Sequence, residues 1–258
     1  MRVVSILCYH AVDPAWRSPL SVTPAEFQAH CAWVARHRRV VAAGDLAVRL
    51  AGSSKLPRGW AALTFDDGFQ SVFQHAFPLL TRYRLPATIF LVAQTLTPEG
   101  RPVDWVDDVP PGRVATLTLD EVREMQHAGI RFGSHSYSHH DLTILSDEEC
   151  QRDLRASREL LEDLLETRIT LLAYPRGLHS ERVRRAADRA GFTHAFTLPE
   201  RRESIGPHAV PRVGVYPGNG TTALRAKTSP WYLPLRMSRV FPLLRSLTGR
   251  GRTHRRAG

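Results

Sequence analysis

The sequence predicts an α/β protein, a barrel of about seven parallel strands, and three observations support this fold class. At 258 residues, the chain is long enough for one large domain with a full core. Short apolar runs alternate with helical patterns about seven times, which is typical of parallel strands joined by right-handed crossovers. Polar residues suited to chemistry directly follow several of these runs, as expected for barrels, whose sites lie at the carboxyl ends of strands.

The first half of the chain contains three of the predicted strands. Val3 begins a β-branched, apolar run that favours a buried strand. Thr23 and Glu26 around Pro24 are typical of a helix start, with Thr as the N-cap and Glu as its capping-box partner. We expect strands at residues 3–9, 60–65 and 87–93, and helices from residue 24, at 44–50, and from 69 to about 83 with a bend at Pro78.

Residues 94–115 interrupt this alternation with a long stretch rich in Pro and Gly. Such a segment is either a functional lid or a disordered insertion, and both remain open. Beyond it, we expect helices at residues 118–129, 146–165 and 180–190, and strands at 130–133, 169–174, 194–197 and 209–215.

Two clusters of metal-ligand side chains follow predicted strands. Asp66-Asp67-Gly68 ends the run 60–65, and the His-rich segment 135–140 lies about 70 residues later. Alone, the first could be a hairpin turn and the second a polar surface loop. Together at strand ends they favour a divalent metal site. The spacing of four makes His135 and His139 the better pair, with His140 directed elsewhere.

These residues are similar to a known family. The segments 64–68 (TFDDG), 133–139 (GSHSYSH) and 173–177 (AYPRG) resemble the first three motifs of the polysaccharide deacetylases of the NodB-homology type. The resemblance covers residues 3–217, and the opening strand with Tyr9-His10 and the segment 211–213 (PRV) are similar to one branch of that family.

The resemblance implies a distorted (β/α) barrel and metal-dependent removal of N-acetyl groups from amino sugars. By this resemblance Asp67, His135 and His139 hold the metal, most simply Zn²⁺, and Asp66 is the general base. A backbone N–H near Arg176 would help to hold the oxyanion.

Two departures from the family pattern concern the groups opposite Asp66. Many members begin the third motif with an arginine that pairs with the catalytic aspartate, whereas this chain has Ala173. We expect Arg212, on the last strand, to replace it. The family also has a late Leu-rich motif whose histidine serves as the general acid, and this chain lacks that motif. His208 is the only histidine near that place, and it is better explained as a surface residue. The proton donor therefore has no assignment.

Three further residues are candidates for substrate binding. His10 ends the first strand and either lines the mouth or packs at the strand end. Tyr174 belongs to the third motif. Trp105, beside Asp104 in the long loop, either shapes a sugar subsite or belongs to a lid hinge.

Charge divides the chain into a nearly neutral body, residues 1–217, and a basic tail, residues 218–258. The tail holds nine of the 35 Lys and Arg and none of the 25 Asp and Glu, which leaves 26 basic side chains (35 minus 9) for the body. Apolar residues among the tail arginines suit adsorption to an anionic membrane surface. Alternatively, the tail folds its apolar side chains back on the barrel and leaves residues 250–256 disordered. The neutral body argues against nucleic acid as a partner.

Cellular location follows from weaker signals. Three scattered cysteines, Cys8, Cys31 and Cys150, argue against a disulfide framework and favour a reducing compartment. We find neither a signal peptide nor an apolar run long enough to span a bilayer. We therefore expect a cytoplasmic protein, peripheral at the inner membrane face.

The function that these observations favour is N-deacetylation of a polysaccharide or of its lipid-linked precursor. Two alternatives remain. One is a catalytically weak module that binds metal and sugar, and the other is a metal-dependent amidohydrolase that acts on a non-sugar amide.

Overall fold

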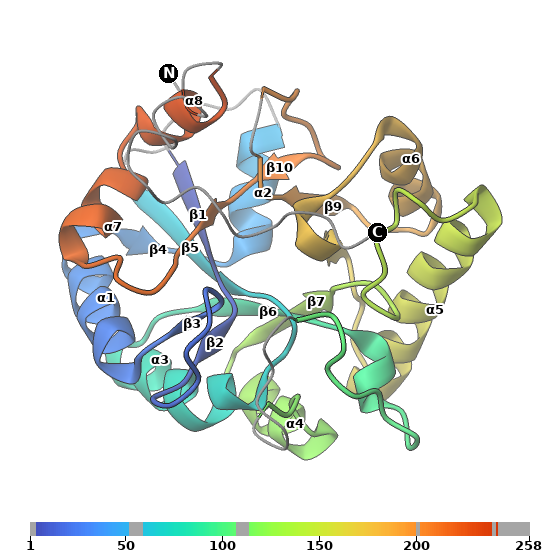
Figure 1. Ribbon diagram of the computed structural model, residues 1–258, viewed down its shortest axis with the longest axis horizontal. Helices are drawn as coiled ribbons and strands as arrows, with labels where there is room; N and C mark the ends of the chain where they lie inside the picture. The colour runs from blue at the N-terminus through green and yellow to red at the C-terminus, as the bar shows by residue number, and fades with distance from the viewer. Residues whose placement is uncertain (1–3, 52–58, 107–113, 200–201, 239–240, 242–258) are drawn as a thin grey trace.

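The computed structural model describes residues 4–51, 59–106, 114–199, 202–238 and 241, and it shows a nearly closed barrel of parallel strands surrounded by helices (Figure 1). The fold class predicted from the sequence is therefore confirmed. The main sheet contains β1 (Val4–Tyr9), β4 (Arg39–Val40), β5 (Trp60–Phe65), β6 (Ala87–Leu91), β7 (Arg131–Ser134), β8 (Leu171–Ala173), β9 (His194–Thr197), β10 (Val210–Pro211) and β11 (Val213–Gly214).

The longer helices lie where the sequence places them. They are α1 (Pro24–His37), α2 (Ala43–Ala51), α3 (Phe77–Tyr83), α4 (Leu119–His127), α5 (Asp147–Leu165) and α6 (Glu181–Arg189). Capping boxes begin three of them, at Thr23, Thr118 and Ser146. In the helical stretch expected from residue 69 to about 83, a π-helical turn, η1 (Val72–Ala76), runs directly into α3, and Pro78, where a bend was expected, lies in the first turn of α3.

The barrel closes through a single strand that is interrupted at Arg212. Before this residue, β10 pairs with β9, and after it β11 pairs with β1. The order β10-β9-β8-β7-β6-β5-β1-β11 therefore starts and ends on the same stretch of chain. Counting this stretch once gives seven positions around the barrel, as predicted, and it places Arg212 at the seam.

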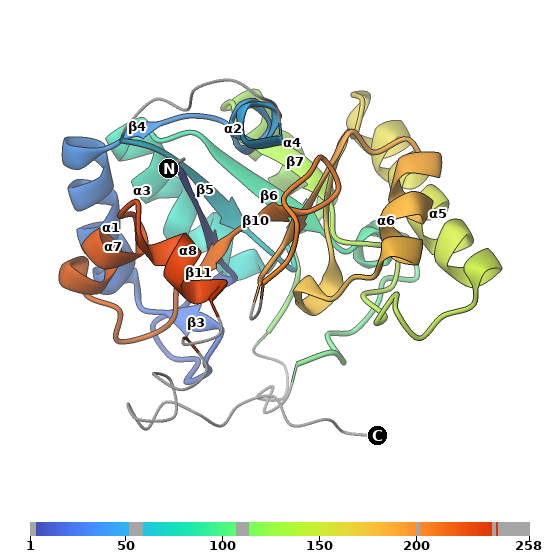
Figure 2. The same ribbon diagram turned by 90° about the horizontal axis from the view of Figure 1, so that it is seen from above.

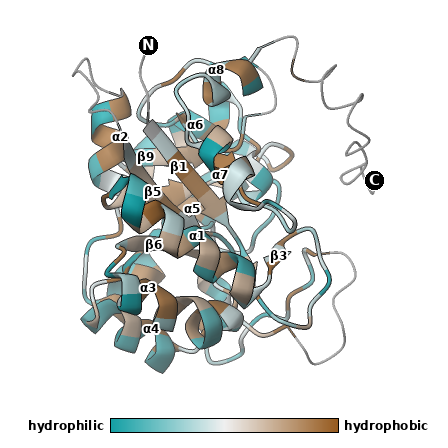
Figure 3. Cartoon of the chain, turned by 90° about the vertical axis from the view of Figure 1, so that its left-hand side faces the viewer, coloured by the Kyte–Doolittle hydropathy of each residue, from teal (hydrophilic) through white to brown (hydrophobic). Residues whose placement is uncertain are grey.

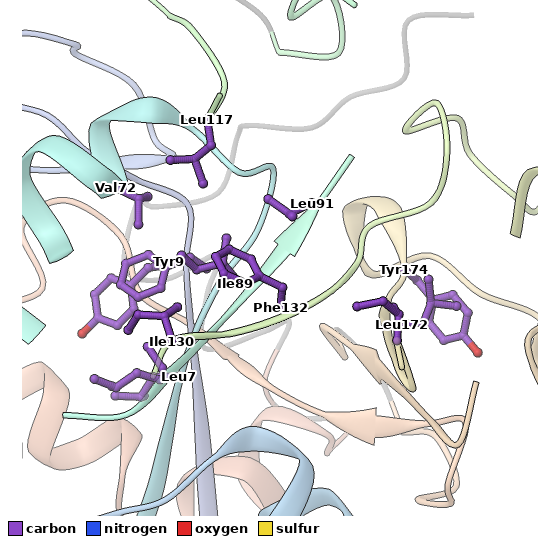
Figure 4. Packing of buried hydrophobic residues seen from close by; sticks show 14 of the residues in the cluster. Leu7, Tyr9, Val72, Ile89, Leu91, Leu117, Ile130, Phe132, Leu172 and Tyr174 are labelled. Carbon is purple, nitrogen blue, oxygen red and sulfur yellow. The ribbon is translucent and has the colours of Figure 1, made fainter. Parts of the chain in front are cut away.

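Alternate strand residues face two different cores, as the period of a strand requires. Inside the barrel, Phe90, Ala173 and Phe196 pack with the apolar side of α2, which covers one end of the barrel (Figure 2). Outside it, a larger cluster lies between the strands and the surrounding helices (Figure 4), and its labelled members include Leu7, Tyr9, Ile89, Leu91, Phe132, Leu172 and Tyr174. Because α2 covers one end of the barrel, the interior is reached from the opposite end, where the strands have their carboxyl ends. We call this open end the mouth.

Several short elements were not expected from the sequence. They are the parallel pair β2 (Ala11–Val12) and β3 (Ser21–Val22), the edge strand β4, the 3₁₀ turns η2 (Ala93–Leu96) and η3 (Pro175–Gly177), and the late helices α7 (Thr221–Lys227) and α8 (Tyr232–Arg236). Each is too short to show a clear hydrophobic period.

Part of the predicted tail packs on the barrel. Leu224 of α7 is fully buried, and Arg236 of α8 donates from Nε to the carbonyl oxygen of Pro199 at 2.8 Å. The chain thus continues as folded structure past the expected boundary at residue 217. The residues expected to be disordered, 250–256, lie outside the described residues, as does the 107–113 part of the long loop. No helix in the described part of the chain has the length and apolar character needed to cross a bilayer.

Candidate active site

The two adjacent aspartates lie in a tight turn at the end of β5. The backbone N–H of Asp66 donates to the carbonyl oxygen of Tyr9 at 3.0 Å, which continues the pairing of β5 with β1. Asp67 and Gly68 then adopt positive φ angles of 69° and 64°. At Gly68 a Cβ atom would lie 2.8 Å from Leu91 Cδ2, and the positive φ adds strain for any other residue, so both features favour glycine here. The turn directs both carboxylates into the mouth.

The histidine loop after β7 is held by hydrogen bonds from neighbouring elements. The N–H of His135 donates to the carbonyl oxygen of Leu91 at 2.7 Å, and the N–H of His139 donates to Ser136 Oγ at 2.9 Å. Asp153 of α5 accepts from the N–H of Tyr137 at 2.8 Å and from Ser138 Oγ at 2.7 Å. Sequence reasoning did not single out Asp153, although it fixes the loop that carries both histidines.

Asp67, His135 and His139 converge on one point, all three buried, with their ligand atoms within 4.8 Å of one another. Asp67 Oδ1 lies 3.2 Å from His139 Nε2 and 3.6 Å from His135 Nε2. His140 is exposed and bonds to Ser138 Oγ through Nδ1, so it is directed elsewhere, as expected.

The donor set of this triad fits a divalent transition metal. His135 Nδ1 lies 2.8 Å from the carbonyl oxygen of Ala173, which can only accept, so Nδ1 carries the proton and Nε2 is left as a ligand. Burial, reinforced by the charge of His139, lowers the pKa of His135 to about 4, which keeps the ring neutral. Burial raises the pKa of Asp67, but the hydrogen bond from His139 and the charges of the surrounding histidines together outweigh it and lower the pKa, so Asp67 is suited to be an anionic ligand.

Arg212 binds the second aspartate through both carboxylate oxygens. Its Nη1 lies 2.6 Å from Asp66 Oδ1 and its Nη2 lies 2.7 Å from Asp66 Oδ2. The guanidinium also donates to Thr64 Oγ1 at 3.2 Å and lies 5.3 Å and 5.9 Å from the ring centres of Phe90 and Phe196. Arg212 therefore lies in the barrel interior against Phe90 and Phe196, the same rings that pack with Ala173, the position where the family pattern has its arginine.

This pair keeps Asp66 ionised inside the barrel. Burial raises the pKa of Asp66, but the Arg212 guanidinium outweighs burial and holds the pKa well below its usual range. Burial likewise lowers the pKa of Arg212, and the Asp66 carboxylate reverses this and raises it. Both partners are almost completely buried, at 1% and 0% exposure, so solvent screens the pair very little.

Cys8, in β1, and His10, which directly follows β1, also lie close to Asp66. Cys8, His10 and Asp66 place their ligand atoms within 4.8 Å of one another, and the Cys8 thiol donates to Asp66 Oδ2 at 3.4 Å. Burial raises the pKa of Cys8 well above its usual value, so the thiol stays protonated, and Arg212 already occupies both oxygens of Asp66. This second cluster is therefore poorly suited to a metal. His10 Nδ1 is buried and has no hydrogen-bond partner among the described residues.

Trp105 reaches from the long loop onto the triad. Its Nε1 donates to Asp67 Oδ1 at 3.1 Å, and its ring stacks on His139 with the ring centres 4.9 Å apart. The neighbouring Asp104 is half-exposed and pairs with Arg101 at 3.0 Å. In the described part of the loop, Trp105 thus closes one side of the site.

Two other residues considered from the sequence, Tyr174 and His208, lie apart from this group. The side chain of Tyr174 is fully buried in the outer cluster, and its hydroxyl donates to the carbonyl oxygen of His208 (Figure 4). This side chain therefore faces the helices and not the mouth, and a substrate-binding role for Tyr174 stays a prediction. His208 donates to the carbonyl oxygen of Phe192 at 2.8 Å, outside the mouth. Arg176 follows β8 with an exposed side chain and a φ of 57°.

The sequence of this chain is similar to those of known proteins. The sequence model of the family described as polysaccharide deacetylase matches residues 53–195, more than half of the chain. The YxkH protein of Bacillus subtilis (strain 168) is 27% identical over 224 residues, which cover 86% of this chain and 74% of that protein. The poly-beta-1,6-N-acetyl-D-glucosamine N-deacetylase of Staphylococcus epidermidis is 26% identical over 209 residues, 75% of this chain and 67% of that enzyme.

Solved structures show the same fold. The deacetylase PplD of Streptococcus pyogenes, in complex with acetate, superposes with a TM-score of 0.76 at 22% identity, over 88% of this chain and 99% of that one. IcaB from Ammonifex degensii superposes with a TM-score of 0.74 at 24% identity, over 88% and 97% of the two chains. Because the family model covers the two aspartates, the histidine pair and the third motif together, the chain belongs to the polysaccharide deacetylase family.

Proposed function

We propose that this chain is a metal-dependent hydrolase that removes N-acetyl groups from the amino sugars of a polysaccharide. The proposal rests on one observation: two adjacent carboxylates in one turn have different surroundings. Asp67 lies with the ring nitrogens of two histidines, while its neighbour Asp66 is held as a buried carboxylate by Arg212. One carboxylate is thus a ligand and the other a proton acceptor.

Asp67, His135 and His139 would hold the cation, most simply Zn²⁺. When bound there, the cation would lower the pKa of water and polarise the amide carbonyl. Asp66 would accept the proton that the attacking water loses, since Oδ1 keeps a lone pair beside its Arg212 bond, whereas Oδ2 accepts from both Arg212 and the Cys8 thiol. The bond from the water oxygen to the carbonyl carbon forms and the C–N bond breaks, which gives acetate and a free amine.

The leaving nitrogen needs a proton, and His10 is the group best placed to give it. Its ring lies beside Asp66, and Nδ1 has no hydrogen-bond partner among the described residues. The charge of a protonated His10 also lowers the pKa of Asp66 and of Asp67, so the ring and the two carboxylates interact across the mouth. The N–H of Arg176, after β8, is proposed to bind the oxyanion that forms on the carbonyl.

For the substrate we propose a polymer of N-acetylglucosamine or its lipid-linked precursor. The support is the Staphylococcus epidermidis relative, which is named for action on poly-beta-1,6-N-acetyl-D-glucosamine. Trp105, stacked on His139 beside the mouth, would contact the sugar at the reacting position. A cytoplasmic location and contact of residues 218–258 with an anionic membrane remain proposals. Co-sedimentation with anionic vesicles, with and without residues 239–258, tests this contact.

Acetate release tests the function directly. Full-length protein loaded with Zn²⁺ is incubated with β-1,6-linked N-acetylglucosamine oligomers, and Asp66→Asn is the matched variant because it keeps the shape of the site and removes the base. We expect a loss on the order of 100-fold or more in kcat for Asp66→Asn, with metal content unchanged. Bound metal without acetate from any amino sugar would favour the weak sugar-binding module, and acetate from simple amides alone would favour the general amidohydrolase.

A further inference from the structure

A hollow on the flank of the barrel lies between α1 and α7, far from the catalytic residues. It has a volume of about 470 Å³ and is lined by Trp33, His37, Arg38 and Arg225. The two helices pack together on the face that Figure 3 presents. Arg38 directly precedes β4, whose Arg39 pairs with Trp60, the first residue of β5. The hollow is therefore near the amino ends of the strands, opposite to the mouth.

The guanidinium of Arg38 is held in place at this hollow. Nη1 donates to the carbonyl oxygen of His37 at 2.8 Å, and Nη2 donates to Thr228 Oγ1 at 3.0 Å. Its carbon lies 4.8 Å from the ring centre of Trp33, which in turn stacks on His37 with the ring centres 4.8 Å apart. Nε is buried and has no hydrogen-bond partner among the described residues. All of these partners are neutral, so the charge of Arg38 is not compensated by them.

Arg225 adds a second positive charge to the same hollow. It is exposed in the last turn of α7, and within the described residues neither Arg38 nor Arg225 forms an ion pair with a carboxylate. Burial, and then the charge of Arg225, lower the pKa of Arg38, as expected for two cations that face the same hollow. The sequence offers no acid nearby: residues 27–44 and 204–258 contain no Asp or Glu.

We propose that this hollow binds a phosphate group between Arg38 and Arg225. Two guanidiniums that share a site without a carboxylate are stabilised by an anion between them, and the planar guanidinium suits the oxygens of phosphate. The exposed ring of His37 offers one more donor when it is protonated. The phosphate comes either from a soluble phosphate compound or from the headgroup of an anionic lipid. Either source leaves the mouth free, because the two sites lie at opposite ends of the barrel.

Two binding measurements on the full chain test this site and separate the two sources. In the first, inorganic phosphate is titrated into the protein in a calorimeter at low salt. In the second, the protein is sedimented with vesicles of phosphatidylglycerol mixed with phosphatidylcholine, and with pure phosphatidylcholine as the reference. The test variant is Arg225→Gln, which changes an exposed side chain, and the control is Arg155→Gln, the same charge change at an exposed position of α5.

We expect Arg225→Gln to weaken binding by about tenfold or more in at least one of the two measurements, while Arg155→Gln binds like the wild type. Loss in the calorimeter indicates a soluble phosphate, and loss on anionic vesicles indicates a lipid headgroup. The proposal is overturned if the wild type binds neither ligand, or if the two variants bind equally. Acetate release by Arg225→Gln from soluble oligomers should equal that of the wild type, so this test is independent of the catalytic proposal.

Discussion

Replacing Arg212 by methionine is the sharpest perturbation of the proposed base. Methionine fills much of the same space between Phe90 and Phe196, but it removes both hydrogen bonds to Asp66 and the only guanidinium that the described structure places against this carboxylate. Asp66 would remain buried and without its cation, so the protonated form becomes easier to populate. The metal ligands are not touched by the change.

The size of the effect follows from the geometry. An opposite charge at this distance lowers the pKa of an aspartate by about 1 to 3 units, so the acidic limb of the kcat/KM profile should move up by about that amount. Removing one partner of a buried pair should also cost about 3–5 kcal/mol in the free energy of unfolding. Because Arg212 holds the folded-state pKa of Asp66 below the unfolded value of about 3.9, the pair stabilises the fold above that pH and loses this contribution as pH falls below it.

The assay is acetate release between about pH 4 and 9 together with metal content and urea unfolding. The double variant Arg212→Met with Asp66→Asn is the control for stability, since it leaves no unpaired charge at positions 66 and 212 and should be more stable than Arg212→Met alone. An acidic limb that does not move, with metal content unchanged, would show that Arg212 does not set the state of Asp66, and our account of the base would be wrong.

Three further changes address the ligands, the lid and the proton donor. His139→Ala should abolish stable metal binding, measured by metal analysis after dialysis, while the circular dichroism spectrum stays native. Trp105→Phe keeps a ring over His139 but removes the bond to Asp67, and we expect metal affinity to fall about 10- to 100-fold; unchanged affinity would restrict Trp105 to substrate contact. His10→Gln should lower kcat by about 100-fold with metal content unchanged, and a kcat equal to that of the wild type would exclude His10 as the donor.

The metal triad could be predicted from the sequence because it depends on local rules. Asp67 and His135 directly follow apolar strands, and the carboxyl ends of parallel strands meet at one end of a barrel. Arg212 could also be anticipated, because Ala173 left the expected arginine position empty and the last strand offered another. The structure places this guanidinium on Asp66, although its catalytic role stays a proposal.

Other contacts of the site could not be predicted from the hydrophobic periodicity of the sequence. Trp105 lies 38 residues from Asp67 along the chain, and Cys8 lies 58 residues from Asp66. A loop that folds over the mouth carries no repeating pattern that would show where it packs. The burial of the Tyr174 side chain could have been anticipated, since alternation along β8 puts residue 174 on the side opposite to Ala173, which faces the barrel interior.

We propose above all that one turn of the chain provides both a metal ligand, Asp67, and a base, Asp66, for N-deacetylation. The most direct measurement is acetate release from a β-1,6-linked N-acetylglucosamine oligomer by the wild type, after chelation, and after one equivalent of Zn²⁺ is returned. We predict that activity disappears on chelation, returns with the metal, and stays absent in metal-loaded Asp66→Asn. Acetate release that survives complete removal of metal, or that Asp66→Asn retains, would contradict this claim.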